Sequence, residues 1–231
     1  PLDVANRPRT KEIRSAIKAY RKNLSAHAEY QLESAVSFSD VLTISPLFGL
    51  GASGNELNQV IEDLFLQVQE KLVICTPYFN FPRTLRSKIA HLLEQGKRVE
   101  IIVGDKVAND FYIPPEQPFK MAGALPYLYE SNLRRFCEKF DAYIKNGHLT
   151  VRLWKDGDNT YHLKGVWVDN QYILLTGNNL NPRAWRLDAE NGLLIHDPKQ
   201  ELLSQAEKEL SHIRQHTKVL QDYSELEELT Q

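Results

Sequence analysis

The sequence contains little cysteine and no long apolar run, and each shortage narrows the classes of protein to which it can belong. Only Cys75 and Cys137 occur, and no Cys-x-x-Cys pair suggests a bound metal. Both cysteines lie in apolar segments, so we expect buried free thiols rather than a disulfide, in a reducing, cytoplasmic setting. No uninterrupted apolar run of about 18 residues is present, which predicts that the chain has no transmembrane helix.

An excess of charge of either sign is also lacking. The net charge is −2, so a nucleic acid or an anionic membrane would have to be met by a local basic patch, and no nucleic-acid partner is expected. Internal repeats and low-complexity tracts are absent. The chain begins with Pro1 rather than methionine, which predicts a piece of something longer. Residues 1–9, polar and with two prolines, read as a linker from a missing N-terminal half.

The hydrophobic pattern of the first half alternates between helical and strand-like segments. Helical spacing begins after Thr10, recurs from Asn55, and returns around Leu85 until Gly96, which is suited to cap a helix C-terminus. The short apolar runs KLVICTPYF and RVEIIVG lie between and after these helices. This rhythm predicts parallel strands with right-handed crossovers, and therefore an α/β sheet.

The second half predicts a long loop, a helix and several strands. Residues 105–129 contain four prolines and many aromatic residues, and loops of this length in a compact domain are usually functional. A helix is expected around Leu133, followed by the strand HLTVRLW. The runs YHLKGVWVD and YILLTG, joined at Asn170-Gln171, predict a hairpin. A strand GLLIHD and a long charged C-terminal helix complete the prediction of one domain over residues 10–231.

The hairpin carries a candidate site, His162-x-Lys164-x4-Asp169. On a strand His162 and Lys164 point to one face, while Asp169 points to the other. An imidazole can attack phosphorus or protonate a leaving oxygen, and an ammonium offsets charge on phosphate oxygens. Asp169 is better placed to fix backbone or a basic partner than to perform chemistry. The plain alternative is a half-exposed polar face.

Two further features favour the chemical interpretation. Thr176-Gly177-Asn178-Asn179 follows the paired strand, where small residues leave room for a phosphate and Asn179 can donate a hydrogen bond to it. Glu190 stands at the start of the next strand. A carboxylate there can accept a hydrogen bond from the second imidazole nitrogen and orient the ring.

These residues together resemble the signature of the phospholipase D superfamily. In that superfamily the last stretch is usually Gly-Ser-x-Asn, and Thr176-Gly177 stand here in the first two places, so hydroxyl assistance at the second is lost. The resemblance implies a phospholipase D-like mixed sheet flanked by helices, with the motif on a strand and hairpin. It does not specify a substrate.

A narrower resemblance covers nearly the whole chain. The segments TPYFN, VEIIVGDK, NDFYIP, GALPYLYE, VRLWKDGDNTYHLKG and TGNNLNPRAWRLDAEN are similar to the C-terminal half of the bacterial phospholipase D-type phosphatidylserine synthases. Members of that family carry two His-x-Lys motifs in a chain about twice this length, and this chain has one. The resemblance therefore implies a partner, which is either an N-terminal half of the same protein or a second copy.

The resemblance also implies a reaction. The family makes phosphatidylserine from CDP-diacylglycerol and L-serine through a phosphatidyl-histidine, with no metal or cofactor in the chemical step. His162 would be one of the two histidines, Lys164 and Asn179 would hold phosphate oxygens, and Glu190 would orient His162. The implied location is the cytoplasmic surface of the inner membrane, as a peripheral protein.

Other interpretations remain open. Arg183 and Arg186 are candidates for binding the second phosphate of a CDP group, or for pairing with Asp188 or Glu190. A single-motif nuclease of the same superfamily that dimerises is the alternative enzyme. A non-catalytic half for interface formation and lipid docking is the alternative from another class.

Overall fold

The computed structural model describes residues 7–27, 40–118 and 120–227. The chain divides into two compact units, residues 1–37 and residues 38–231. The first unit contains helix α1 (Arg7–His27), which begins before Thr10 and exposes Ile13, Ile17 and Tyr20. Residues 1–6 of the predicted linker lie outside the described residues.

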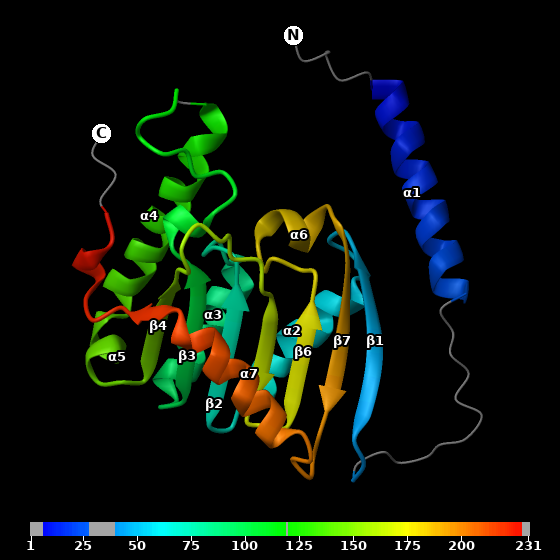
Figure 1. Cartoon of the computed structure of the whole chain (residues 1–231). Helices are drawn as coiled ribbons and strands as arrows, with labels where there is room; N and C mark the ends of the chain where they lie inside the picture. Colours follow the sequence, from blue (N-terminus) through cyan, green and yellow to red (C-terminus); the bar gives the residue numbers. More distant parts are fainter. Residues whose placement is uncertain (1–6, 28–39, 119, 228–231) are drawn as a thin grey trace. The chain divides into compact units, whose positions relative to one another are not determined.

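The second unit is built on an eight-stranded mixed sheet (Figure 1). The strands are β1 (Thr43–Leu50), β2 (Lys71–Thr76), β3 (Arg98–Gly104), β4 (Leu149–Trp154), β5 (Gly165–Val168), β6 (Tyr172–Thr176), β7 (Ala189–His196) and β8 (Thr217–Val219). Their order is β1-β7-β6-β5-β2-β3-β4-β8, in which β2, β3 and β4 are parallel and the other pairs are antiparallel. The predicted mixed α/β sheet is confirmed.

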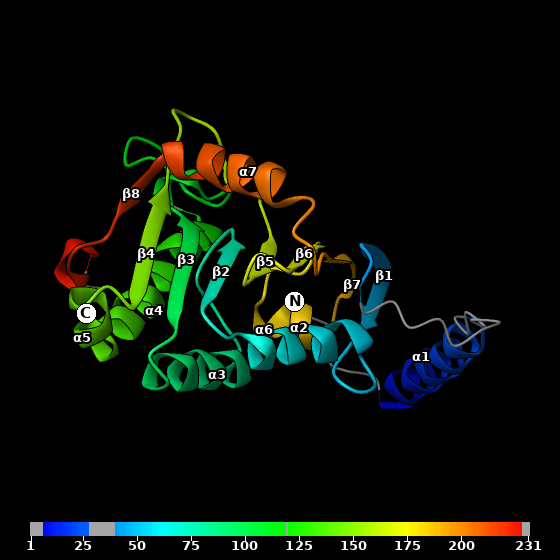
Figure 2. The same ribbon diagram turned by 90° about the horizontal axis from the view of Figure 1, so that it is seen from below.

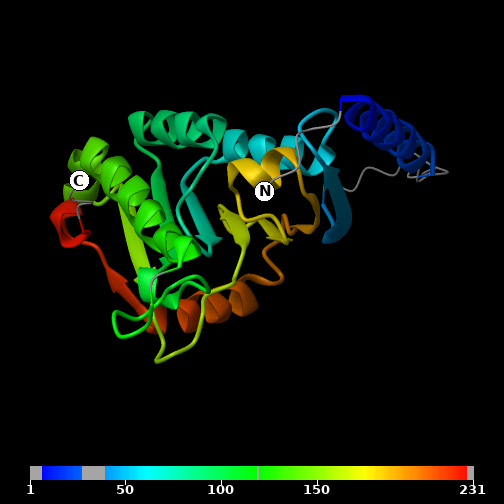
Figure 3. The same ribbon diagram turned by 90° about the horizontal axis from the view of Figure 1, so that it is seen from above.

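Helices cover both faces of this sheet (Figures 2 and 3). The longer helices are α2 (Glu56–Gln67), α3 (Arg83–Glu94), α4 (Leu125–Lys139) and α7 (Leu203–Gln215), and α5 (Asp141–Lys145) and α6 (Pro182–Arg186) are short. Leu72 and Ile74 of β2 pack in the larger core with α2, α3 and α4, while Val73 and Cys75 face the smaller core beneath α7. Because side chains alternate along a strand, a strand covered on both faces is apolar throughout, as β2 is.

The helix signals in the sequence correspond to real caps. The Asn55 side chain accepts a hydrogen bond from the Asn58 amide at the start of α2. Gly96 follows α3 with a φ of +75°, a conformation that favours glycine. Cys75 and Cys137 are buried free thiols, as predicted. Across the described ranges, no helix combines the length and the apolar character needed to cross a membrane.

Some elements differ from the sequence prediction. Strands β1 and β8 were not predicted, and the C-terminal helix ends at Gln215 because β8 follows it and pairs with β4. The predicted loop 105–129 contains two short 3-10 helices, η1 (Lys106–Ala108) and η2 (Met121–Ala124), and the first residues of α4.

The predicted hairpin forms, but it is shorter than expected. Its turn places Asp169 and Asn170 at positive φ, and the Gln171 amide donates to the Val168 carbonyl. His162 and Lys164 lie on the irregular segment before β5 rather than within the strand. Strand β2 ends at Thr76, and Pro77 follows it. Because proline has no N–H to donate, the pairing of β2 with β5 does not continue to the segment that contains His162.

Candidate active site

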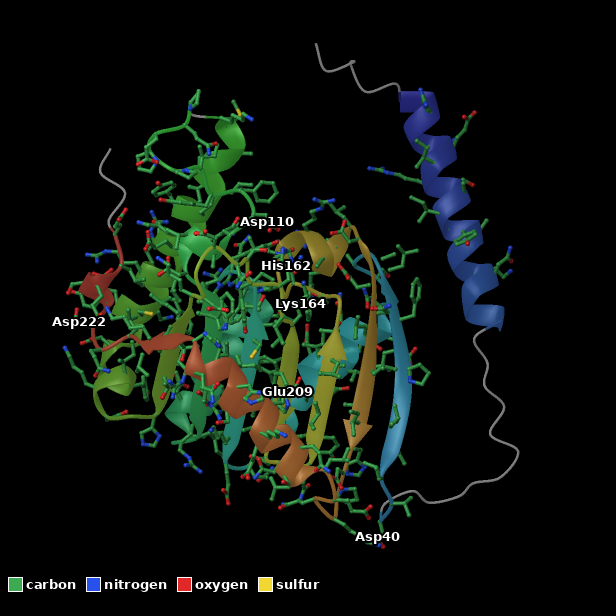
Figure 4. All side chains as sticks on the ribbon, in the orientation of Figure 1. Asp40, Asp110, His162, Lys164, Glu209 and Asp222 are labelled. Carbon is green, nitrogen blue, oxygen red and sulfur yellow. The ribbon has the colours of Figure 1, made fainter. Side chains whose placement is uncertain are left out.

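The candidate site lies at the end of the sheet where the parallel strands β2, β3 and β4 finish. His162 and Lys164 lead into β5, which runs antiparallel to β2, so they reach this same end. Glu190 is at the start of β7, and the loop after β3 supplies Asp110. Figure 4 shows Asp110, His162 and Lys164 grouped there, with Glu209 of α7 farther down the molecule. In open α/β sheets this is the end at which ligands usually bind.

His162 presents an accessible imidazole to this site. Its side chain is 59% exposed, and its Nε2 lies 2.6 Å from Oδ2 of Asp110. An open cavity of about 530 Å³ adjoins the ring and is lined also by Trp154, Tyr161 and His212. Lys164 does not line this cavity, so the two motif residues do not share it. An exposed imidazole that contributes little to the core is suited to nucleophilic or acid–base chemistry.

Asp110 is held in place by its backbone. The Phe111 amide donates to the Asn109 side chain and the Tyr112 amide donates to the Asn109 carbonyl, which forms a tight turn at Asp110. The buried residue Ala108 accepts a hydrogen bond from the Tyr161 amide at 2.9 Å, one residue before His162. The carboxylate and the imidazole are therefore positioned by adjoining, hydrogen-bonded segments.

Lys164 lies partly buried beside the His162 backbone. Its Nζ donates to the His162 carbonyl at 2.7 Å. Burial lowers the pKa of Lys164, and the negative charges of Glu190 and Asp110 oppose that shift. An ammonium in this position offers its remaining N–H donors to a phosphate.

Glu190 interacts with Lys164 rather than with the imidazole. Burial raises the pKa of Glu190, Asp188 raises it further, and the charges of Lys164 and Arg183 oppose the rise. The carboxylate lies over Gly177, where a Cβ atom would come within 2.8 Å of Oε2. The predicted bond from Glu190 to His162 is not found between these two described residues, because Asp110 provides the carboxylate that contacts the ring.

The segment after β6 is fixed by side-chain hydrogen bonds. The Thr176 hydroxyl donates to the Asn191 carbonyl at 2.6 Å and accepts from the Asn178 amide at 3.0 Å. Asn178 is buried and accepts from the Leu180 amide. The Asn179 carbonyl accepts from Thr76, and its side-chain Oδ1 is buried without a hydrogen-bond partner among the described residues. Thr176 therefore shapes this segment, and the Asn179 carboxamide lies next to it with its oxygen closed off from solvent.

Asp169 is at the opposite end of β5 from the site. Its carboxylate accepts hydrogen bonds from the backbone amides of Gln69, Glu70 and Lys71, at 2.5, 2.9 and 2.6 Å. It thereby fixes the entry to β2 against the β5–β6 turn. Although it belongs to the motif, the fold places it away from the chemistry.

The two arginines after the site differ in their contacts. Arg183 Nε lies 3.2 Å from Asp188 Oδ1, so the structural pairing is present, although the Arg183 side chain is 77% exposed. Arg186 is exposed on α6. Asp110 is the site residue that sequence reasoning missed. Asp110 belongs to the segment NDFYIP, one of those that resemble the phosphatidylserine synthases, and nothing else in the sequence connects it with His162.

Comparisons with known proteins identify the family to which the chain is similar. Residues 61–214 match the family described as cardiolipin synthase, PLD-like domain. The chain is 81% identical over its full length to 51% of the CDP-diacylglycerol–serine O-phosphatidyltransferase of Haemophilus influenzae, and 54% identical over 99% of its length to half of PssA, the enzyme of that name from Escherichia coli. A third relative, CDP-diacylglycerol–glycerol-3-phosphate 3-phosphatidyltransferase of Schizosaccharomyces pombe, is 28% identical over 69% of this chain and 31% of its own.

Solved structures show the same fold. A crystal structure of phosphatidylserine synthase from Haemophilus influenzae is similar with a TM-score of 0.88 and 81% identity, over 99% of this chain and 51% of that chain. Nuc, a phospholipase D family member from Salmonella typhimurium, is similar with a TM-score of 0.51 and 13% identity, over 79% of this chain and all of its own. The second likeness concerns the fold alone.

The chain belongs to the phospholipase D-like domain family. Within it, the predicted resemblance to the bacterial phosphatidylserine synthases is confirmed by the 81% identity to the Haemophilus influenzae enzyme. The chain spans about half the length of the curated synthases it matches.

Proposed function

We propose that the protein containing this chain transfers a phosphatidyl group from CDP-diacylglycerol to L-serine, and that the chain supplies the second of two catalytic motifs. The observation that carries the proposal is the accessible His162 imidazole beside Lys164, in a chain 81% identical to a relative named for this reaction. The names of these three relatives share CDP-diacylglycerol, whereas the acceptor is serine for two of them and glycerol 3-phosphate for the third. The donor is therefore the better supported of the two substrates.

The proposed reaction proceeds through a phosphatidyl-histidine. One histidine attacks the phosphorus that bears the diacylglycerol, and the P–O bond to CMP breaks while the other histidine gives a proton to the departing CMP. That second histidine then takes the proton of the serine hydroxyl. The serine oxygen bonds to phosphorus as the P–N bond breaks, which restores both imidazoles. His162 serves as one of the two.

The remaining site residues bind and orient phosphate in this proposal. Lys164 and the N–H donors of the Asn179 carboxamide hold the non-bridging oxygens, and the negative charge of Glu190 favours the charged form of Lys164. The space beside Thr176 and Gly177 admits the phosphate. Arg183 binds the second phosphate of the CDP group by exchanging Asp188 for it, with Arg186 beside it, because a guanidinium matches phosphate geometry.

We further propose that an N-terminal half, or a second copy, covers an apolar face of the sheet. On this face Ile44 and Phe48 of β1, Leu175 of β6 and Leu193 of β7 are 61%, 47%, 38% and 47% exposed. Leu193 pairs with Leu175 and with Pro46, so these side chains lie on one surface beside the strand that follows the motif. A contiguous exposed apolar surface of this kind is typical of an interface.

Peripheral association with the cytoplasmic face of the inner membrane completes the proposal. Helix α1 carries many arginine and lysine residues and Glu12 as its acidic residue, with Ile13, Ile17 and Tyr20 exposed. Such a helix is suited to lie on an anionic bilayer. Met121, 88% exposed in the loop before α4, is a second candidate for contact with lipid.

The test is an assay of the full-length protein that contains this chain, in detergent with CDP-diacylglycerol. CMP release that requires L-serine, with phosphatidylserine as the product, is the expected result. Equal CMP release with and without L-serine would contradict the transferase, and cleavage of DNA in place of the lipid would support the dimeric nuclease instead.

A further inference from the structure

The carboxylate of Asp110 lies beside the His162 imidazole, in a site where the proposed phosphoryl transfer does not require a negative charge. A site that binds and transfers phosphate is stabilised by cations, and an anion beside the reacting nitrogen repels the phosphate. Yet Asp110 Oδ2 lies 2.6 Å from Nε2 of His162, and its charge reaches Lys164. The turn at Asn109 and the hydrogen bond between Ala108 and Tyr161 fix it there, so the contact is built into the fold.

When phosphorus bonds to Nε2 of His162, the carboxylate of Asp110 loses the ring nitrogen that it contacts. That carboxylate is 47% exposed and remains beside the reacting nitrogen, where it can bind a cationic group that a ligand brings. The CDP-diacylglycerol donor has no cationic group at neutral pH. L-Serine has one, and only two carbon atoms separate its ammonium from the hydroxyl oxygen that attacks phosphorus.

We infer that Asp110 is the specificity residue that binds the ammonium group of the acceptor. The inference depends on the proposed function and deepens it by naming how the acceptor is chosen. Before the acceptor binds, Asp110 pairs with the His162 imidazole. When the acceptor binds, its ammonium takes the place of the imidazole, and the hydroxyl is thereby directed toward the reacting phosphorus. This exchange holds whether His162 is the nucleophile or the base.

The relatives' names are consistent with this role. The Schizosaccharomyces pombe relative is named for glycerol 3-phosphate, an acceptor with an anionic group and no ammonium. A fixed carboxylate at the reaction centre disfavours such an acceptor and favours an amino alcohol. Asp110 therefore selects by attraction of one acceptor and repulsion of the other.

The test compares Asp110→Asn with wild type in the full-length protein, by two assays. The first is CMP release with L-serine, and with 3-hydroxypropanoate, which has the hydroxyl and carboxylate of serine but no ammonium. The second is exchange of labelled CMP into CDP-diacylglycerol without any acceptor. We expect kcat/KM for L-serine to fall about 10- to 100-fold, the range for losing a charge-assisted hydrogen bond. Exchange and turnover of 3-hydroxypropanoate should stay within about threefold.

Controls separate this role from a structural one. Asp158→Asn changes an exposed aspartate in the loop before His162 that has no recorded partner in the described part of the chain, and it should leave both assays unchanged. Asp110→Ser provides a second variant, and a melting curve for each shows that it folds. Asp110→Glu should recover part of the serine activity, because it restores the charge.

Each outcome bears on the inference. Loss of exchange in parallel with serine transfer would show that Asp110 only positions His162, and an unchanged kcat/KM for L-serine would overturn the ammonium contact. A wild-type protein that exchanges CMP but releases none with L-serine would refute the proposed acceptor, and the inference with it. If the wild-type protein is active with L-serine and Asp110→Asn has the same kcat/KM, the inference about Asp110 is refuted while the proposed function stands.

Discussion

At the scale of single residues, the imidazole of His162 is the group on which the proposed chemistry depends most. Its side chain is 59% exposed and contacts Asp110, so removing it costs the fold little. We expect His162→Ala in the full-length protein to reduce serine-dependent CMP release by several orders of magnitude, with an unchanged melting temperature. His91→Ala, a change at an exposed histidine of α3 that does not line the cavity beside His162, is the control and should retain activity. Near-normal turnover of His162→Ala would show that the histidine is structural.

Glu100 is the residue whose charge matters most for stability. Its side chain, 6% exposed on β3, contacts Arg152, Arg214 and Lys71. Burial opposes its ionisation, but hydrogen bonds and charge from these partners, Arg214 above all, lower the pKa from 4.5 to about 2. Because the folded-state pKa is depressed, this contribution is complete above about pH 4.5 and is lost as the pH falls toward 2. The shift corresponds to roughly 3 kcal/mol.

Glu100→Gln should therefore lower the free energy of unfolding at pH 7 by roughly 3 kcal/mol, because it removes the buried charge that these partly exposed cations contact. The difference from wild type should shrink steadily below pH 4.5. Urea denaturation at pH 7, 5, 4 and 3 measures it. Glu62→Gln, which breaks the more exposed pair with Lys88, should change stability by less than about 1 kcal/mol at every pH. A pH-independent gap for Glu100→Gln would show that the depressed pKa is not the source.

At the scale of elements, the site is assembled by strand ends, and the sequence showed these unevenly. Strands β2, β3 and the β5–β6 hairpin were predictable because each is a continuous apolar or alternating run with a clear stop. Strand β1 contains Pro46 and Gly49, and β8 has three residues, so their strand character depends on β7 and β4. The motif located His162 and Lys164, but Asp110 lies 52 residues earlier in sequence, and only the fold brings it to the ring.

In the β5–β6 turn, the motif residue Asp169 stabilises the backbone at the start of β2 and does not contact His162 or Lys164. Asp169 adopts a φ of +50°, which aspartate tolerates better than most residues, and receives the three amides that begin β2. Asp169→Ala should lower the free energy of unfolding by roughly 2 kcal/mol. Activity per folded molecule should stay within a few fold. Urea denaturation and CMP release, measured on the same sample, test both statements.

Asp169→Asn is the matched variant for this position. It keeps the tolerance for positive φ and one acceptor oxygen, so its loss of stability should be smaller than that of Asp169→Ala. The opposite pattern, full stability with activity abolished in both variants, would show that Asp169 takes part in catalysis.

At the scale of the whole molecule, the described chain holds half of the proposed chemistry. One histidine cannot both attack phosphorus and protonate the leaving CMP in the same step, and the sequence holds one His-x-Lys motif. The apolar face that includes Phe48, Leu175 and Leu193 is the surface on which we expect the other half to pack. We therefore expect function to depend on association, although residues 38–231 form a compact unit by themselves.

We expect the 231-residue chain to be inactive as a monomer and to regain serine-dependent CMP release when the other half is supplied as a separate chain. Leu193→Glu should prevent this recovery, because a charge in the centre of an apolar interface costs several kcal/mol when it is buried without a partner. Leu66→Glu places the same charge at an exposed leucine of α2 and should leave recovery intact. Size-exclusion chromatography with light scattering gives the oligomeric state of each sample before the assay.

CMP release by the monodisperse monomer at a rate near that of the full-length enzyme would show that His162 alone suffices. Recovery by Leu193→Glu equal to that of wild type would move the interface away from this face.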